Sequence, residues 1–171
     1  MNGPIDAELL GQLLDEHGPA LALYATQWTD SADDCVQEAL VELARQSTRP
    51  EHVVAWLYRV VKNRALNAAR GERRRRERES QAVADRFART QSSAFDSCDA
   101  IAASGALVHL GQDERELVVM RIWGGLTFDE IAFSLAISTS TAHRQYERAL
   151  TKLRVILESP CSTNKNRTNN T

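Results

Sequence analysis

Residues 126–154 read LTFDEIAFSLAISTSTAHRQYERALTKLR, and their pattern decides the fold class. Thr127 and Glu130 have the spacing of a capping box, which places a hydroxyl and a carboxylate beside the free N–H groups of a helix start. The apolar spacing predicts a capped short helix over residues 127–136 and, after a tight turn, a longer helix over residues 139–157. This is the layout of a helix-turn-helix.

The longer of these two helices has an apolar and a polar side. At about 100° per residue, the apolar side holds Ala142, Tyr146, Ala149, Leu150 and Leu153. Small and polar residues at the start of such a helix can meet base edges in a major groove. The residues predicted to contact DNA are Thr139, Ser140, Thr141, His143, Arg144 and Arg148. A plain helical hairpin without DNA contacts is the alternative interpretation. A metal-binding role for His143 is not expected, because no second histidine or cysteine lies at a suitable spacing.

Helix signals also dominate the rest of the chain. A second capping box is predicted from Ser31 to Asp34, and another helix, over residues 113–122, ends at a glycine pair. No run alternates apolar and polar residues as a strand would. Further element boundaries are predicted at Pro4, Pro19, Pro50 and Pro160. We therefore predict an all-α chain.

The length of 171 residues suits one domain or two small ones. Residues 81–100 and residues 159–171 are rich in polar residues and lack sustained periodicity. We therefore predict two small helical domains, over residues 1–80 and residues 101–158. A flexible linker joins them, and a polar tail follows the second.

Several function classes find no support in the sequence. The three cysteines are too widely spaced for a CxxC metal or redox site, and their odd number argues against a disulfide framework. We find no glycine-rich phosphate loop, metal-ligand cluster or nucleophile motif, so we predict no catalytic residue, no metal, no cofactor and no enzyme activity. The longest apolar runs, of which Ala20–Ala25 is one, are too short to span a bilayer. We predict a cytoplasmic protein without a membrane or secretion segment.

Positive charge is concentrated in one block. The net charge is only -2, yet residues 59–89 hold 11 basic and 4 acidic side chains. The helix predicted to follow Pro50 places amides and cations along one stripe, which holds Arg59, Lys62, Asn63, Asn67 and Arg70. Amides can read base edges while cations hold phosphates, so this stripe is a candidate nucleic-acid surface. An exposed, solvated helix is the alternative.

A second polar helix face lies closer to the N-terminus. The apolar side of this predicted helix holds Ala32, Val36, Ala39, Leu40 and Leu43. The opposite side holds Asp34, Gln37, Glu38, Val41 and Arg45. Periodicity alone leaves two interpretations open, a solvated face or a face for a partner.

Three segments carry a family resemblance. Residues 32–40, ADDCVQEAL, are similar to the core-binding segment of the sigma factors of bacterial RNA polymerase, and residues 55–63, AWLYRVVKN, are similar to the WLYRIAxN segment of that family. Residues 126–154 resemble its carboxy-terminal helix-turn-helix. Together they resemble the small two-domain, extracytoplasmic-function type over nearly the whole chain except the ends and the linker.

The resemblance implies a docking surface for the polymerase core and a site for the minus-ten element. The residues that it places against the clamp helices of the largest polymerase subunit are Asp33, Asp34, Gln37 and Glu38. Asn63 and Asn67 are implied to lie beside an unpaired, flipped base of the non-template strand. The cations implied to hold the adjacent phosphates are Arg59, Lys62, Arg70 and Arg73.

The helix-turn-helix is implied to hold the duplex minus-thirty-five element, and the polymerase would tether both domains to one promoter. The implied function is a sigma factor that binds core RNA polymerase and directs promoter recognition, DNA melting and transcription initiation at a specific set of promoters. Its implied partners are the polymerase core and promoter DNA, with an anti-sigma factor left open. The rival hypothesis is a helix-turn-helix regulator that binds duplex DNA without the polymerase core.

Two positions depart from the family pattern. Ala136 stands where the family usually has a glycine before the turn, and His143 stands where it usually has a basic residue. Both lie in the helix-turn-helix, so both bear on the minus-thirty-five element. The promoter sequence, the regulated genes and the inducing signal are not encoded in any motif that we find.

Overall fold

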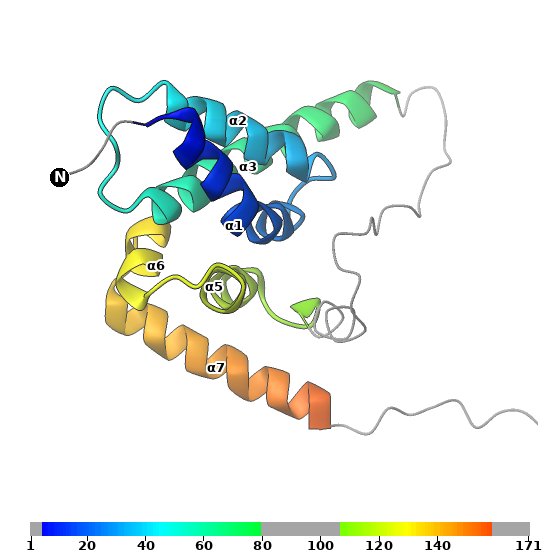
Figure 1. Cartoon of the computed structure of the whole chain (residues 1–171). Helices are drawn as coiled ribbons and strands as arrows, with labels where there is room; N and C mark the ends of the chain where they lie inside the picture. Colours follow the sequence, from blue (N-terminus) through cyan, green and yellow to red (C-terminus); the bar gives the residue numbers. More distant parts are fainter. Residues whose placement is uncertain (1–4, 80–106, 159–171) are drawn as a thin grey trace, which may run out of the picture.

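The computed structural model describes residues 5–79 and 107–158, and the regular structure in these ranges is helical. Figure 1 shows two groups of helices. The first group comprises α1 (Ala7–Ala25), α2 (Ala32–Ala44) and α3 (Val53–Glu79). The second comprises α5 (Gln112–Ile122), α6 (Phe128–Leu135) and α7 (Thr139–Glu158). The predicted all-α class is confirmed, whereas the predicted linker and tail lie outside the described residues.

The first group is held together by an apolar seam between its three helices. Each of these helices packs against the other two. The side chains in the seam that have no exposed surface include Leu21, Tyr24, Ala39, Leu43, Leu57 and Val61. They recur three or four residues apart on each helix, which is the spacing of one buried helix face. The apolar side predicted for the second helix is therefore confirmed.

Two sequence predictions about helix ends are wrong. Pro19 lies inside α1, where its missing N–H leaves the Asp15 carbonyl without a helical bond. Both residues are exposed, so water can take that bond. Ser31 makes no side-chain cap bond, because its backbone (φ -92°, ψ 45°) is not extended as a cap requires. Its N–H donates instead to Thr29 Oγ1 at 3.1 Å.

The second group contains the predicted helix-turn-helix. Thr127 Oγ1 accepts from the Glu130 N–H at 3.3 Å, and the Glu130 carboxylate accepts from the Thr127 N–H at 2.8 Å, so this capping box is confirmed. α5 and α6 both pack on α7. Of the predicted apolar side of α7, Leu150 alone is exposed, at 38%. It lies about 80° around the helix from Ala142, at the edge of the buried side.

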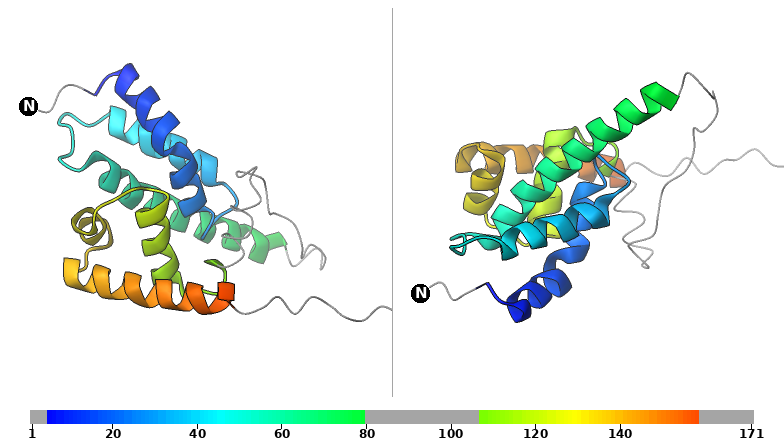
Figure 2. Two further views of the ribbon diagram at one scale, coloured as in Figure 1. Left: turned by 60° about the horizontal axis from the view of Figure 1, so that its bottom comes forward. Right: turned by 90° about the horizontal axis from the view of Figure 1, so that it is seen from above.

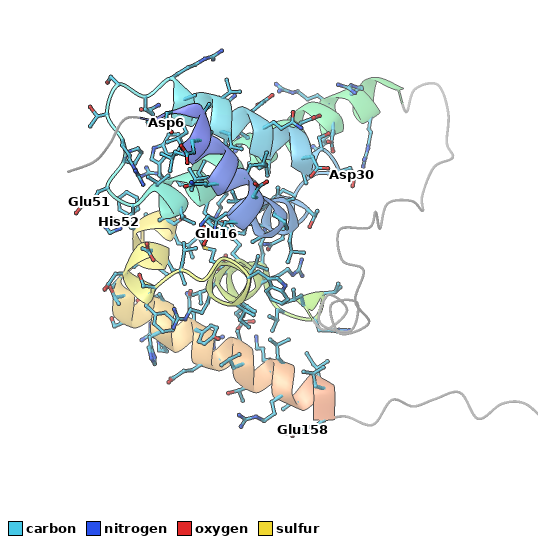
Figure 3. All side chains as sticks on the ribbon, in the orientation of Figure 1. Asp6, Glu16, Asp30, Glu51, His52 and Glu158 are labelled. Atoms are coloured by element: carbon cyan, nitrogen blue, oxygen red, sulfur yellow. The ribbon has the colours of Figure 1, made fainter. Side chains whose placement is uncertain are left out.

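The two groups contact each other along α1 and α3. α5 packs on α1, and α6 packs on α3 (Figure 2). His52, labelled in Figure 3, lies beside α6: its Nδ1 is 3.9 Å from Glu130 Oε1, and its ring centroid is 5.9 Å from that of Phe133. The C-terminal part of α3 projects beyond both groups (Figure 1). None of the helices in the described ranges is both long enough and apolar enough to cross a bilayer.

Ala136 ends α6 in the left-handed conformation, with φ 55° and ψ 43°. A side chain with a Cβ is strained there by about 1–2 kcal/mol, because the Cβ approaches the following carbonyl oxygen. Glycine carries no such strain. This is the physical reason for the glycine that the resemblance led us to expect before the turn.

We predict that Ala136→Gly raises the free energy of unfolding by about 1 kcal/mol, because it removes this strain. Urea denaturation followed by circular dichroism measures the change. Ala132→Gly is the matched control, since Ala132 lies inside the same short helix, where glycine destabilises by about 1 kcal/mol. A loss of stability in both variants would contradict the interpretation.

Candidate DNA and polymerase interfaces

Four of the predicted DNA-contacting residues form one exposed stripe along α3. The stripe consists of Arg59, Asn63, Asn67 and Arg70. At about 100° per residue, they span about 80° of the helix surface. Arg70 Nη1 donates to Asn67 Oδ1 at 3.3 Å, which leaves the NH₂ of Asn67 as a donor. Arg73 is exposed one turn further along the helix.

Lys62 lies apart from this stripe, although the sequence predicted it there. Its side chain is half-buried, and Nζ donates to Oε2 of Glu116 in α5 at 2.6 Å. The same ammonium group lies 5.7 Å from the ring centroid of Trp28. The fold therefore turns Lys62 toward the second helix group, while the stripe faces outward.

The predicted docking residues lie together on α2. Asp33, Asp34, Gln37 and Glu38 are all exposed, and the last three line one shallow pocket. The pocket also includes Val41 and Arg45, which the sequence placed on the same helix face. Its remaining members, Glu42 and Arg64, were not predicted from the sequence. Val41 is 48% exposed and gives this polar surface an apolar centre.

Arg64 of α3 organises the carboxylates of this pocket. Its guanidinium lies 3.3 Å from Glu38 Oε2 and 2.5 Å from Glu42 Oε2. The hydrogen bond to Glu42 raises the pKa of Arg64 above its ordinary value. Two carboxylates one helical turn apart were visible in the sequence, but their partner comes from another helix. Only the packing of α2 on α3 brings Arg64 to them.

The predicted contacts at the start of α7 already have partners within the protein. Thr139 Oγ1 donates to Asp129 Oδ1 at 2.8 Å. Ser138 Oγ accepts from the Thr141 N–H at 3.2 Å and lies 2.8 Å from Thr141 Oγ1 and 3.1 Å from Ser140 Oγ. These bonds hold the helix start in one geometry. The hydroxyls of Thr139, Ser140 and Thr141 can each still take part in a further hydrogen bond.

The remaining predicted contacts on α7 differ in availability. The His143 ring centroid lies 4.7 Å from that of Phe128, and Arg148 Nη2 lies 3.6 Å from a carboxylate oxygen of Glu114. Arg144 is exposed and forms no ion pair with another described residue. In the described ranges, no three histidine, cysteine or acidic side chains gather as they would around a metal ion.

Two sequence matches assign the two helix groups. Residues 13–75 match Sigma-70 region 2, and residues 106–155 match Sigma-70, region 4. The chain belongs to the sigma-70 family. Helices α1–α3 lie in region 2 and helices α5–α7 in region 4, the pair expected for a sigma factor of the extracytoplasmic-function type. Sigma factors are non-enzymatic subunits. The region 2 match in the N-terminal half favours the sigma factor over the rival hypothesis of a regulator that binds duplex DNA without the polymerase core.

Two solved structures share the fold of this sigma factor. CnrH in complex with the cytosolic domain of CnrY is 24% identical, with a TM-score of 0.58 and 91% of each chain covered. The sigma factor RpoE in complex with the anti-sigma factor NepR from Bartonella quintana is 21% identical, with a TM-score of 0.63, and 91% of this chain and 99% of that chain are covered. Among curated proteins, none matches the sequence significantly.

A polar cluster that the sequence did not predict joins region 2 to region 4. Glu116 in α5 is only 3% exposed, and its Oε2 accepts both from Lys62 Nζ and from Tyr24 Oη, the latter at 3.1 Å. Burial raises the pKa of Glu116, and the bond from Lys62 acts in the opposite direction. Burial, followed by the charge of Glu116, also raises the pKa of Tyr24.

Within region 4, Glu114 ties α5 to α7. Lys152 Nζ donates to both oxygens of its carboxylate, at 2.7 Å each, and the Gly111 N–H donates at 3.2 Å. The hydrogen bond from Lys152 holds the pKa of Glu114 below its ordinary value of 4.5. The Glu114 carboxylate is therefore a stabilising group only while it is ionised.

We predict that Glu114→Gln lowers the melting temperature at about pH 7, since it removes a charge-assisted bond of about 1 kcal/mol. A lowered folded-state pKa gives stability above the ordinary pKa of 4.5 that is lost as the pH falls through the folded-state value. The difference in melting temperature between wild type and variant should therefore be about the same at pH 7 and at about pH 5. It should become smaller when the pH is lowered to about 3.5. A difference that does not change with pH would refute the ionic role of Glu114.

Proposed function

We propose that this sigma factor binds core RNA polymerase and directs promoter recognition, DNA melting and transcription initiation at a specific set of promoters. The observation that carries the proposal is the exposed amide and arginine stripe of region 2, on Arg59, Asn63, Asn67 and Arg70. Exposed amides of this kind can hold an unpaired base, which a protein that binds only duplex DNA does not need.

The α2 surface is the proposed docking site for the polymerase core. Its exposed carboxylates and amide suit a polar, complementary surface such as the clamp helices of the largest subunit. The ion pairs of Arg64 with Glu38 and Glu42 support this role, because they hold the docking carboxylate of Glu38 and the neighbouring Glu42 in one geometry before binding. A preorganised surface loses less side-chain entropy on association.

The α3 stripe is the proposed minus-ten site. Asn63 and Asn67 can donate to and accept from the edge of a flipped base, since a side-chain amide carries both kinds of group. Arg59, Arg70 and Arg73 lie beside them, within reach of the phosphates on either side. Lys62 joins this set only when it leaves Glu116, because its ammonium group donates a hydrogen bond to that carboxylate.

Region 4 is the proposed minus-thirty-five site. The start of α7 would enter the major groove, with the hydroxyls of Thr139, Ser140 and Thr141 closest to the base edges. Arg144 is the side chain best suited to base recognition, because it is exposed and can form a bidentate bond to guanine. We assign His143 and Arg148 to flanking contacts.

The proposal includes a cytoplasmic location, where the polymerase and its promoters are. It also includes an anti-sigma factor as a further partner. Support for this partner comes from the shared fold: CnrH was solved with the cytosolic domain of CnrY, and RpoE with the anti-sigma factor NepR.

The direct test is transcription in vitro. The purified full chain is added to bacterial core polymerase together with promoter fragments from the source genome, and the transcripts are sequenced. New start sites that share two spaced motifs would support the proposal. A lack of transcripts, with core polymerase shown to be competent by another sigma factor, would overturn it.

We predict that Asn63→Ala combined with Asn67→Ala lowers open-complex formation at these promoters at least about tenfold, because the flipped base loses its hydrogen bonds. Permanganate footprinting of unpaired thymines measures the opening. Binding to core polymerase and the fold should be unchanged, since both asparagines are exposed and alanine is the better helix former. Gln12→Ala, which removes an exposed amide from α1, is the matched control; normal opening in the double variant would refute base capture.

We predict that Arg144→Ala weakens binding to the upstream element by about 1–3 kcal/mol and relaxes the base preference at one position, as expected when a bidentate base contact is lost. Competition between promoter fragments for the polymerase holoenzyme measures both effects. Arg154→Ala is the matched control, because Arg154 is an exposed arginine on the same helix about 15 Å away. An equal loss on all sequences would identify Arg144 as a phosphate contact instead.

A further inference from the structure

Regions 2 and 4 fit each other closely at their junction, in what we call the closed arrangement: α5 and α6 packed on α1 and α3. Tyr24 and Tyr58 of region 2 meet edge to face, with ring centroids 4.9 Å apart. Tyr24 donates to Glu116, and a Cβ on Gly124 would lie 2.5 Å from Tyr58 Oη. Region 4 is therefore shaped to the ends of the two tyrosine rings.

The closed arrangement brings the two DNA surfaces too close to bind one promoter. A chain of contacts runs from Lys62 to Glu116, and from Glu114, two residues away, to Arg148 and, one turn further, Arg144. Even with extended side chains, this chain limits the distance from Lys62 to Arg144 to about 40 Å. Elements centred about 25 base pairs apart are separated by about 85 Å of straight duplex. The junction must open before both elements are held.

The junction also engages Lys62, one of the cations proposed to hold DNA phosphates. Lys62 Nζ lies 2.6 Å from Glu116 Oε2, which is the geometry that an ammonium group makes with a phosphate oxygen. We propose that Glu116 acts as an internal substitute for a DNA phosphate, and that the closed arrangement is an autoinhibited state in which this carboxylate occupies Lys62. The inference rests on the proposed role of Lys62 in phosphate binding.

The carboxylate thus acts as a competitor with a high effective concentration, because it is part of the same chain. The apparent affinity for DNA equals the affinity of the open form multiplied by the fraction of molecules that are open. Breaking the junction raises that fraction without changing any residue that touches DNA. Opening also uncovers the buried tyrosines. A bound polymerase core shifts the equilibrium between the closed and open forms only if it binds the open form better.

The first test measures compactness by small-angle X-ray scattering of the full chain. Glu116→Gln and Tyr24→Phe should both increase the radius of gyration, since each weakens a bond across the junction. Tyr58→Phe is the matched control: its hydroxyl is buried without a hydrogen-bond partner in the described part of the chain, so its loss should leave the chain as compact as the wild type. An unchanged radius for Glu116→Gln would overturn the proposal.

The second test measures affinity for a labelled single-stranded oligodeoxynucleotide of about 12 nucleotides at fixed salt. Glu116→Gln should bind about tenfold more tightly, as expected from the loss of one hydrogen bond to a charged group. The gain should vanish in a Lys62→Gln background. Asp113→Asn controls for the change in net charge, because Asp113 is exposed on the same helix. A gain that persists without Lys62, or one that Asp113→Asn reproduces, would overturn the proposal.

Failure of this inference can be told apart from failure of the proposed function. If the chain does not support transcription, but Glu116→Gln expands it and tightens DNA binding through Lys62, the function is wrong and the autoinhibited state holds. If transcription succeeds and neither Glu116→Gln effect occurs, the function holds and the autoinhibited state is refuted.

Discussion

The buried carboxylate of Glu116 is the constraint on which the arrangement of the two regions depends. A carboxylate that is 3% exposed is stable only if its charge is paired and its oxygens accept hydrogen bonds. Both conditions are met from region 2, by Lys62 and Tyr24. Region 4 therefore has one preferred position on region 2. Apolar contacts alone are not directional and would define that position less sharply.

α3 contributes residues to the junction between the two regions and to two other surfaces. Three consecutive residues on it have three different surroundings: Lys62 bonds to Glu116 of region 4, Asn63 faces solvent, and Arg64 pairs with Glu38 and Glu42 on α2. Since neighbouring residues on a helix point about 100° apart, one helix can contribute to the inter-region junction, the proposed DNA surface and the proposed docking surface at once. The junction residue Lys62 is consequently the direct neighbour in sequence of Asn63, which belongs to the proposed DNA stripe.

The helix-turn-helix is rigid for local reasons. The Thr127 and Glu130 capping box starts α6, Ala136 turns the chain in a left-handed conformation, and Ser138 bonds to the first turn of α7. Asp129 adds a bond to Thr139 across the turn. The residues proposed to contact DNA at the start of α7 would therefore lose little conformational freedom on binding, even though their hydroxyls already have partners.

The sequence by itself determined the helical class, the positions of α5, α6 and α7, the exposed amide stripe and the polar face of α2. All of these follow from patterns within one helix turn or one cap, which chemistry between near neighbours sets. Tertiary structure alone decided the destinations of Lys62 and Arg64 and the burial of Glu116. Lys62 and Glu116 lie 54 residues apart, and periodicity says which side of a helix a residue is on but not which helix will cover it. That choice is made by packing, which brings charges from distant parts of the chain together wherever burial demands a partner.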